Sequence, residues 1–131
     1  MNFIGSTKSY FVNWLDFQTR SSRSEYWWGY LGGTIVGLLV GIGCKFITEM
    51  LDWSLETLVL PLLIYLFIAG LSLAVRRLHD SDKTGWWLLI SFSLVGLAPL
   101  LYWYCKKGDE GENRFGPNPL EDIQAGSLSE G

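Results

Sequence analysis

Three apolar stretches decide the fold of this chain: WWGYLGGTIVGLLVGIG at residues 27–43, LVLPLLIYLFIAGLSLAV at 58–75 and WWLLISFSLVGLAPLLYWY at 86–104. Each is about long enough to cross a hydrocarbon core roughly 30 Å thick as a helix. Together they fill over a third of the 131 residues and leave no segment long enough for a separate soluble domain. We therefore expect an all-α polytopic membrane protein with three transmembrane helices.

A short helix in the membrane interface is expected ahead of the first span. Aromatic and aliphatic residues recur at three- and four-residue spacing within residues 6–17, which suits an amphipathic helix too short to span. Charged residues interrupt the first 26 positions, so no signal peptide is expected. Residues 1–119 are predicted to form one helical domain, and residues 120–131, acidic and small, a disordered tail.

Glycine recurs at every fourth position of the first span, at Gly29, Gly33, Gly37 and Gly41. A row of glycines on one side of a helix lets another backbone approach closely. We expect this glycine ridge to pack against the second or third helix of the same chain, or alternatively against a second copy in a homo-oligomer. Just before the span, Ser22 and Glu25 form a capping-box pattern that marks the start of its helix.

The distribution of positive charge predicts the orientation. The second connection, RRLHDSDKTG at 76–85, carries three bases, whereas the first, at 44–57, carries one base and three acids. Because positive residues collect on the cytoplasmic side, the N-terminus and the second connection are expected there. Three spans then place the C-terminus outside, although Lys106 and Lys107 favour the inside. If the C-terminus is inside, the last apolar run is re-entrant.

Residues that could carry chemistry are few. The single histidine, His79, adjoins Asp80, but no further nitrogen or sulfur ligand accompanies it, so we predict no catalytic site, metal or cofactor. Arg76 is expected to pair with Asp80 one helical turn away. Cys44 and Cys105 would both lie at the outer ends of their spans, as a disulfide or, in the interpretation we prefer, as two free thiols.

Basic and aromatic side chains gather on the predicted inner face. Guanidinium groups beside aromatic rings at headgroup depth can bind a lipid phosphate, although ordinary topogenic charge explains the same residues. The candidates for binding anionic lipid or a protein partner are Arg20, Arg23, Arg76, Arg77, His79, Lys83, Trp27 and Trp87. No nucleic-acid partner is expected.

Two other function classes are open. A transporter or channel component would act as a homo-oligomer with a pore lined by Ser72, Ser91 and Ser93. The three spans carry no Asp, Glu, Lys, Arg or His, however, and ion pathways usually place such residues inside the membrane. An enzyme would have to use His79 and Asp80, with Glu25 as the one plausible helper.

Three blocks of sequence resemble a known family. DFQTRSSRSEYWW at 16–28, RRLHDSDKTGWW at 76–87 and GENRFGPNP at 111–119 are similar to the bacterial inner-membrane family called domain of unknown function 805 (DUF 805). The resemblance implies a small multi-pass protein and brings no activity with it. It selects for study Arg20, Arg23, Glu25 and Trp27, then Arg77, His79, Asp80 and Trp87, then Asn113, Arg114 and Phe115. If the third block lies on the same face as the second, the blocks form one composite ligand site.

Overall fold

The computed structural model describes residues 2–121, and within that range the regular elements are helices. They are α1 (Phe3–Val12), α2 (Arg23–Leu51), α3 (Leu55–Asp80), the 3₁₀ helix η1 (Gly85–Phe92) and α4 (Leu94–Cys105). The predicted all-α class is confirmed. The predicted disordered tail falls almost wholly outside the described residues.

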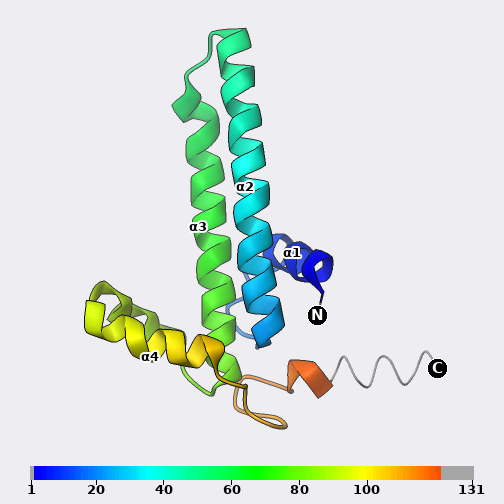
Figure 1. Cartoon of the computed structure of the whole chain (residues 1–131), viewed down its shortest axis with the longest axis vertical. Coiled ribbons are helices and arrows are strands. Elements are labelled where there is room, and N and C mark those ends of the chain that lie inside the picture. Colours follow the sequence, from blue (N-terminus) through cyan, green and yellow to red (C-terminus); the bar gives the residue numbers. More distant parts are fainter. Residues whose placement is uncertain (1, 122–131) are drawn as a thin grey trace, which may run out of the picture.

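Two long helices, α2 and α3, run side by side in opposite directions and form the body of the molecule (Figure 1). Both are long and apolar enough to cross a membrane, and they contain the first two predicted spans. Large apolar side chains point outward along them: Leu38, Leu39 and Phe67 are 64%, 65% and 67% exposed. Such exposure suits a hydrocarbon environment. The turn between the helices is short, because α2 continues to Leu51 instead of ending before a surface segment at 44–57.

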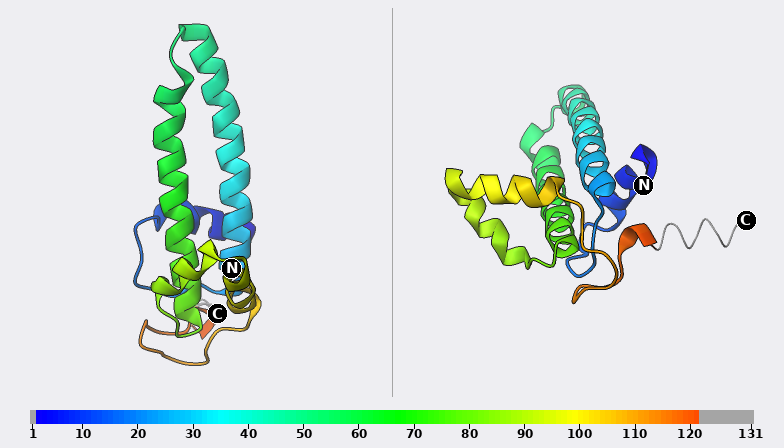
Figure 2. Two further views of the ribbon diagram at one scale, coloured as in Figure 1. Left: turned by 90° about the vertical axis from the view of Figure 1, so that its left-hand side faces the viewer. Right: turned by 60° about the horizontal axis from the view of Figure 1, so that its bottom comes forward.

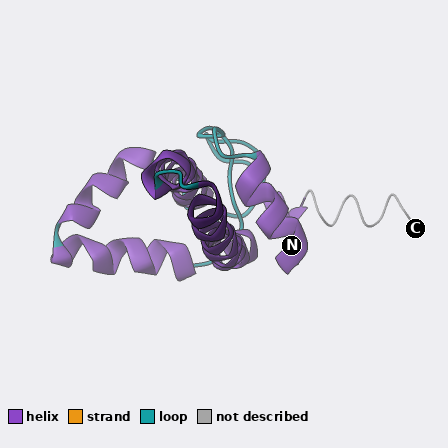
Figure 3. Cartoon of the chain, turned by 90° about the horizontal axis from the view of Figure 1, so that it is seen from above, coloured by secondary structure: helices purple, strands orange, loops and turns teal. Residues whose placement is uncertain are grey.

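The third predicted span is not one continuous helix. The run divides into η1 and α4 at Ser93, whose backbone is extended (φ −106°, ψ 137°). The two pieces form a V beside the end of the long helices where α2 starts and α3 ends (Figures 1 and 3). We call this end the base. Neither the 8-residue nor the 12-residue piece is long enough to cross a membrane. A Cβ at Gly96 would lie 1.9 Å from the Ile90 carbonyl oxygen, so this glycine permits the sharp fold. The expectation of a third long continuous helix is thus corrected to a hairpin of two short helices.

The N-terminal helix crosses the base of α2 on the side away from η1 and α4 (Figures 1 and 3). It begins earlier than predicted because the Asn2 side chain caps it, accepting a hydrogen bond from the backbone N–H of Gly5 at 2.7 Å. It ends at Val12, so Trp14 and Leu15 lie beyond it. Its direction across the long helices suits the predicted interfacial position.

The glycine ridge is largely covered within the chain. Added Cβ atoms at Gly29 and Gly33 would contact Ser6 and Tyr10 of α1, and one at Gly37 would contact Leu66 of α3. Gly41 has open space around it. Packing within the chain was expected from the second or third helix, yet α1 covers much of the ridge. Contact with a second copy is not tested by a single chain and stays a prediction.

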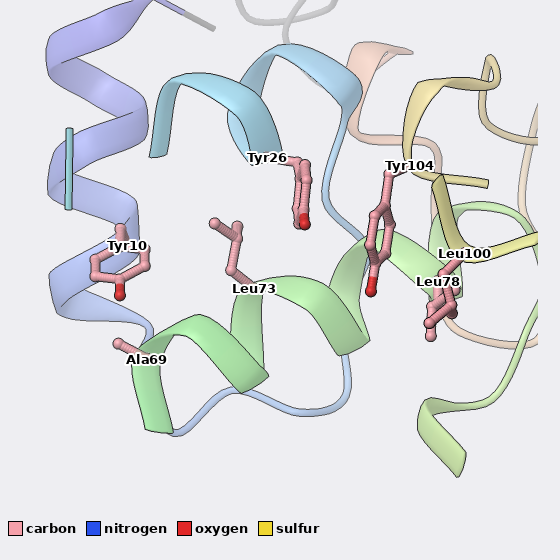
Figure 4. Close-up of a cluster of buried hydrophobic side chains, with 7 residues drawn as sticks. All are labelled: Tyr10, Tyr26, Ala69, Leu73, Leu78, Leu100 and Tyr104. Carbon is pink, nitrogen blue, oxygen red and sulfur yellow. The ribbon is translucent and has the colours of Figure 1, made fainter. Parts of the chain in front are cut away.

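The buried apolar cluster lies at the base, where α1, the start of α2, the end of α3 and the end of α4 meet (Figure 4). Its members are Tyr10, Tyr26, Ala69, Leu73, Leu78, Leu100 and Tyr104. The rings of Tyr26 and Tyr104 stack with centroids 4.6 Å apart, which ties the end of α4 to α2. The base therefore gathers the start of α2, the end of α3 and the segment after α4 (Figure 2).

Candidate ligand-binding site

The three sequence blocks meet at the base around the guanidinium group of Arg20. This group from the first block pairs with the Asp80 carboxylate of the second, with Nη2 and Oδ1 2.9 Å apart. It also donates hydrogen bonds to the carbonyl oxygens of Asp109 (2.7 Å), Gly111 (2.8 Å) and Gly116 (3.2 Å). The third block thus wraps around a buried cation of the first. Block three lies on the same face as the other two, and the C-terminal segment returns to the end that carries the start of α2.

A second buried guanidinium, that of Arg77, shares the same carboxylate. Arg77 is fully buried and binds the other carboxylate oxygen of Asp80. Its remaining hydrogen bonds go to the backbone carbonyl oxygens of Ser21, Tyr104 and Lys106. Two buried cations around one carboxylate are tolerated because charge-assisted hydrogen bonds to carbonyl dipoles satisfy the rest of each group.

Arg76 pairs with Glu25 and not with Asp80, which corrects the predicted partner. Arg76 Nη1 and Glu25 Oε1 are 3.0 Å apart, and the Ser9 hydroxyl donates to the same carboxylate oxygen at 2.6 Å. Ser22 caps α2 as predicted, accepting from the Glu25 backbone N–H at 3.3 Å. The Glu25 carboxylate, however, joins α2 to α3 and α1 and does not reach back to complete the capping box.

An open pocket of about 930 Å³ lies where the three blocks meet. We call it the motif pocket. It is lined by residues 17–19 of the first block, by His79 and residues 84–86 of the second, by residues 114–117 of the third, and by Val75. A pocket made by all three blocks is the composite site that the sequence allowed only for a re-entrant last run.

His79 forms the floor of the motif pocket. His79 as a whole is 4% exposed, and its ring stacks on Phe115, with centroids 3.8 Å apart and planes within 4°. Nδ1 lies 2.9 Å from the Thr19 carbonyl oxygen. A carbonyl can only accept, so Nδ1 carries the proton and Nε2 of the neutral ring is an acceptor. The Asn113 amide donates to the His79 carbonyl oxygen at 2.8 Å, which holds the third block against this floor.

Hydrogen-bond donors line the rim. The Arg114 side chain is 57% exposed, and its Nε and Nη2 donate to the Asp82 carboxylate (3.1 Å) and carbonyl oxygen (2.8 Å). Among the contacts of the described residues, Arg114 Nη1 has no hydrogen-bond partner, and the guanidinium group lies over the Phe115 ring, 4.9 Å from its centroid. Thr84 precedes η1 without using its side chain as a cap, and the first N–H groups of a helix lack partners within it. Arg114, Thr84 and the start of η1 all line the same pocket.

Apart from His79 in the pocket floor, the residues predicted to bind lipid divide into two groups. Arg20, Arg76 and Arg77 are 5%, 2% and 0% exposed and bind groups of the protein itself. The others reach the surface or its edge: Arg23, which donates to the Cys105 carbonyl oxygen, Lys83, which lies over the Trp103 ring, and Trp27 and Trp87, each 43% exposed. Thr84 and Gly85 were not singled out beforehand, because nothing in their residue types marks a pocket.

The alternative function classes find little support in this geometry. Asp80 is engaged by two arginines and so does not orient His79 as a catalytic dyad would require. Ser72 donates to backbone carbonyl oxygens of Asn13 and Asp16, whereas Ser91 belongs to η1 and Ser93 joins η1 to α4, outside the two long helices. Within residues 2–121, no group of three His, Cys, Asp or Glu side chains is placed to hold a metal ion.

The two cysteines are free thiols at opposite ends of the molecule. Cys44 belongs to the far part of α2, whereas Cys105 ends α4 at the base (Figure 1). The expectation that both lie at the same end of the molecule is corrected, because the run that precedes Cys105 forms a hairpin beside the base and not a third long helix.

A family model described as a protein of unknown function (DUF805) matches residues 14–117. The chain belongs to the DUF805 family. The match runs from just after α1 to the end of the motif pocket. Among similar proteins of Escherichia coli K12, inner membrane protein YhaI is 37% identical over 108 residues, covering 82% of this chain and 88% of YhaI. Inner membrane protein YhaH is 32% identical over 114 residues, covering 82% of this chain and 89% of YhaH. No solved structure matches this DUF805 chain. It is a helical membrane protein of an uncharacterised family.

Proposed function

We propose that this protein is a non-enzymatic bacterial inner-membrane protein that binds an anionic phospholipid in its motif pocket, at the cytoplasmic face. The observation that carries the proposal is the convergence of all three sequence blocks on one open pocket with an exposed guanidinium at its rim. Guanidinium and backbone N–H groups are the donors that bind phosphate in proteins.

The depth of the pocket favours a lipid over a soluble ligand. Val75, the last residue of the apolar run of α3, lines it, and so does Trp86, which is 78% exposed. Tryptophan prefers the level where hydrocarbon gives way to headgroups. A phosphate at Arg114 would therefore leave the acyl chains free to run along the outward-facing apolar side chains of α3.

The buried arginines support the pocket instead of contacting lipid. Arg20 and Arg77 hold the backbone that follows α4, and that backbone carries Arg114 to the rim. Replacing Arg76 and Arg77 together would remove buried ion pairs and disrupt the fold. Arg114 is the better probe because its ion pair is exposed.

Two spans place both motif-bearing ends on one side of the membrane. Nine of the ten Lys and Arg residues then lie at or near the base, and Lys45 alone lies toward the far end of α2. The positive-inside rule makes the base cytoplasmic. With three spans, Lys106, Lys107 and Arg114 would join Lys45 on the outer side, and the bias would be six bases against four.

Orientation is tested with single-cysteine proteins in intact cells and a membrane-impermeant maleimide. Cys105 alone should react only after permeabilisation, whereas a Ser54→Cys variant lacking both native cysteines should react at once. Reaction of Cys105 in intact cells would reverse the orientation or restore a third span, and either result contradicts the proposal.

Lipid binding is tested in nanodiscs of mixed phospholipids by native mass spectrometry of the lipids retained. Arg114→Gln should lower the preference for anionic over zwitterionic lipid by roughly tenfold or more, because a hydrogen bond to a charged group contributes about 1.5–3 kcal/mol. Lys107→Gln removes the same charge from an exposed pair with Glu110 outside the pocket and should change the preference less than twofold. Equal effects of the two substitutions, or none, would reject the motif pocket as the site.

A further inference from the structure

We infer that the motif pocket selects anionic phospholipids whose headgroup carries a free hydroxyl, with His79 Nε2 accepting the hydroxyl hydrogen bond. This inference rests on the proposed lipid-binding function and names the headgroup class. It begins from His79, a buried polar side chain in the pocket floor whose hydrogen bond to the Thr19 carbonyl oxygen uses Nδ1 and not Nε2.

The surroundings of His79 fix its hydrogen-bonding character. The Thr19 carbonyl oxygen requires a proton on Nδ1, and burial of the ring against Phe115 favours the uncharged form. Neutral imidazole then offers a lone pair at Nε2 and no second donor. A ligand that fills the pocket leaves this acceptor unsatisfied unless it brings a donor, and an unsatisfied buried acceptor is unfavourable.

The charges at the rim exclude an ammonium group as that donor. Arg114 repels a second cation, and the Asp82 carboxylate that could attract one is already paired with Arg114. A neutral imidazole offers no charge to compensate an ammonium. A hydroxyl is the donor that fits, so a glycerol headgroup on a phosphodiester matches both the floor and the rim.

Gly85 keeps the start of η1 at the wall of the pocket. A Cβ at this position would lie 2.9 Å from a methyl carbon of Val75, so a larger residue would push η1 away from α3. Residues 84–86 at the start of η1 therefore stay in the wall of the pocket whose floor is His79.

The test compares two anionic lipids of equal charge on the full-length protein in phosphatidylcholine nanodiscs. Phosphatidylglycerol carries hydroxyl donors and phosphatidylmethanol carries none. We expect phosphatidylglycerol to bind about fivefold more tightly to the unaltered protein, as one neutral hydrogen bond predicts. His79→Asn keeps an amide N–H near the position of Nδ1 for Thr19 and removes Nε2. It should make the two lipids bind equally, with both still preferred over phosphatidylcholine.

The outcomes separate the inference from the proposed function. Equal binding of the two anionic lipids by the unaltered protein, both above phosphatidylcholine, would overturn hydroxyl selection and leave anionic lipid binding standing. No preference for either over phosphatidylcholine would overturn both. Competition by soluble sn-glycerol 3-phosphate as strong as that of the diacyl lipid would overturn the membrane lipid as ligand. A retained phosphatidylglycerol preference in a folded His79→Asn protein would overturn the role of His79.

Discussion

Asp80→Asn is the substitution that should most clearly reveal what holds the base together. The Asp80 carboxylate is 3% exposed and lies between two buried guanidinium groups, with Oδ1 on Arg20 and Oδ2 on Arg77. An asparagine of the same shape offers one oxygen and one NH₂ group. Whichever way the amide turns, its NH₂ group faces a guanidinium group, and the only carboxylate between the two cations is lost.

The expected magnitude follows from burial. At the 2.9 Å separation of Arg20 Nη2 and Asp80 Oδ1, the gross attraction is about 6 kcal/mol for an effective dielectric constant of about 20. Desolvation offsets much of that attraction, but breaking a buried pair from one side leaves the other charge uncompensated and costs roughly 3–5 kcal/mol. Whole domains are stable by only about 5–15 kcal/mol, so this substitution should remove a large share of the total.

The matched control is Asp82→Asn, two residues away. Its pair with Arg114 is about half exposed on both sides, so its loss should cost at most about 1 kcal/mol. Unfolding of both variants in mixed detergent micelles can be followed by tryptophan fluorescence. Hydrogen exchange of the Asp109 N–H, which donates to the Asp80 carbonyl oxygen, reports on the third block locally. If the free energies of unfolding of the two variants lie within 1 kcal/mol of each other and the Asp109 N–H exchanges equally slowly in both, the buried cluster does not stabilise the base.

Three further substitutions probe separate contacts. Gly108→Ala should destabilise the protein by roughly 1–3 kcal/mol, because its Cβ would lie 1.8 Å from the buried Asp80 carboxylate; denaturant unfolding measures the loss. Glu25→Gln should cost roughly 3–5 kcal/mol in the same assay by leaving Arg76 unpaired. Burial would raise the pKa of Asp16, but hydrogen bonds from the Thr19 side chain and neighbouring backbone lower it below its ordinary value. Its stabilisation should be present above about pH 4 and lost as the pH falls further, and Asp16→Asn should remove that part of the pH dependence of unfolding.

Each of these three substitutions has a control. Gly41→Ala introduces the same methyl group into open space within α2 and should leave stability unchanged or slightly raise it. Glu49→Gln removes a carboxylate from an exposed pair with Lys45 and should have little effect. For Asp16, unfolding curves at pH 7 and pH 3 that differ by the same amount in the parent and Asp16→Asn proteins would contradict the assignment.

Apolar length predicted the two long helices well, because a helix in hydrocarbon must satisfy its backbone internally over the whole thickness. The length of the apolar run gave the wrong prediction at residues 86–104, because length and apolar composition do not show whether a run is one helix or two. The extended backbone at Ser93 and the close approach of Gly96 to Ile90 depend on tertiary packing. The motif pocket was therefore predicted only as a conditional possibility.

Partner choice among the charges could not be read from spacing. Arg76 and Asp80 stand one turn apart and match the rule for helical ion pairs. Yet Arg76 turns toward α1 and α2, where Glu25 lies, and the Asp80 carboxylate lies between Arg20 and Arg77. In a one-dimensional pattern four of the five arginines, Arg20, Arg23, Arg76 and Arg77, looked equally like candidates for lipid, and Arg114 was not among them. Burial separates those that hold the structure from those that meet the surface.

Two glycines of the third block adopt backbone conformations that place its loop at the pocket. Gly111 and Gly116 have positive φ values of 68° and 123°, which glycine adopts readily and other residues rarely do. Both turn their carbonyl oxygens onto the guanidinium group of Arg20, at 2.8 and 3.2 Å. The residues between them are then forced outward as a loop closed by the Asn113–Gly116 bridge, and Arg114 sits at its exposed tip. The buried Arg20 of the first block thus determines where Arg114 of the third block is exposed. Both residues are arginines, yet Arg20 holds the structure together and Arg114 faces the pocket.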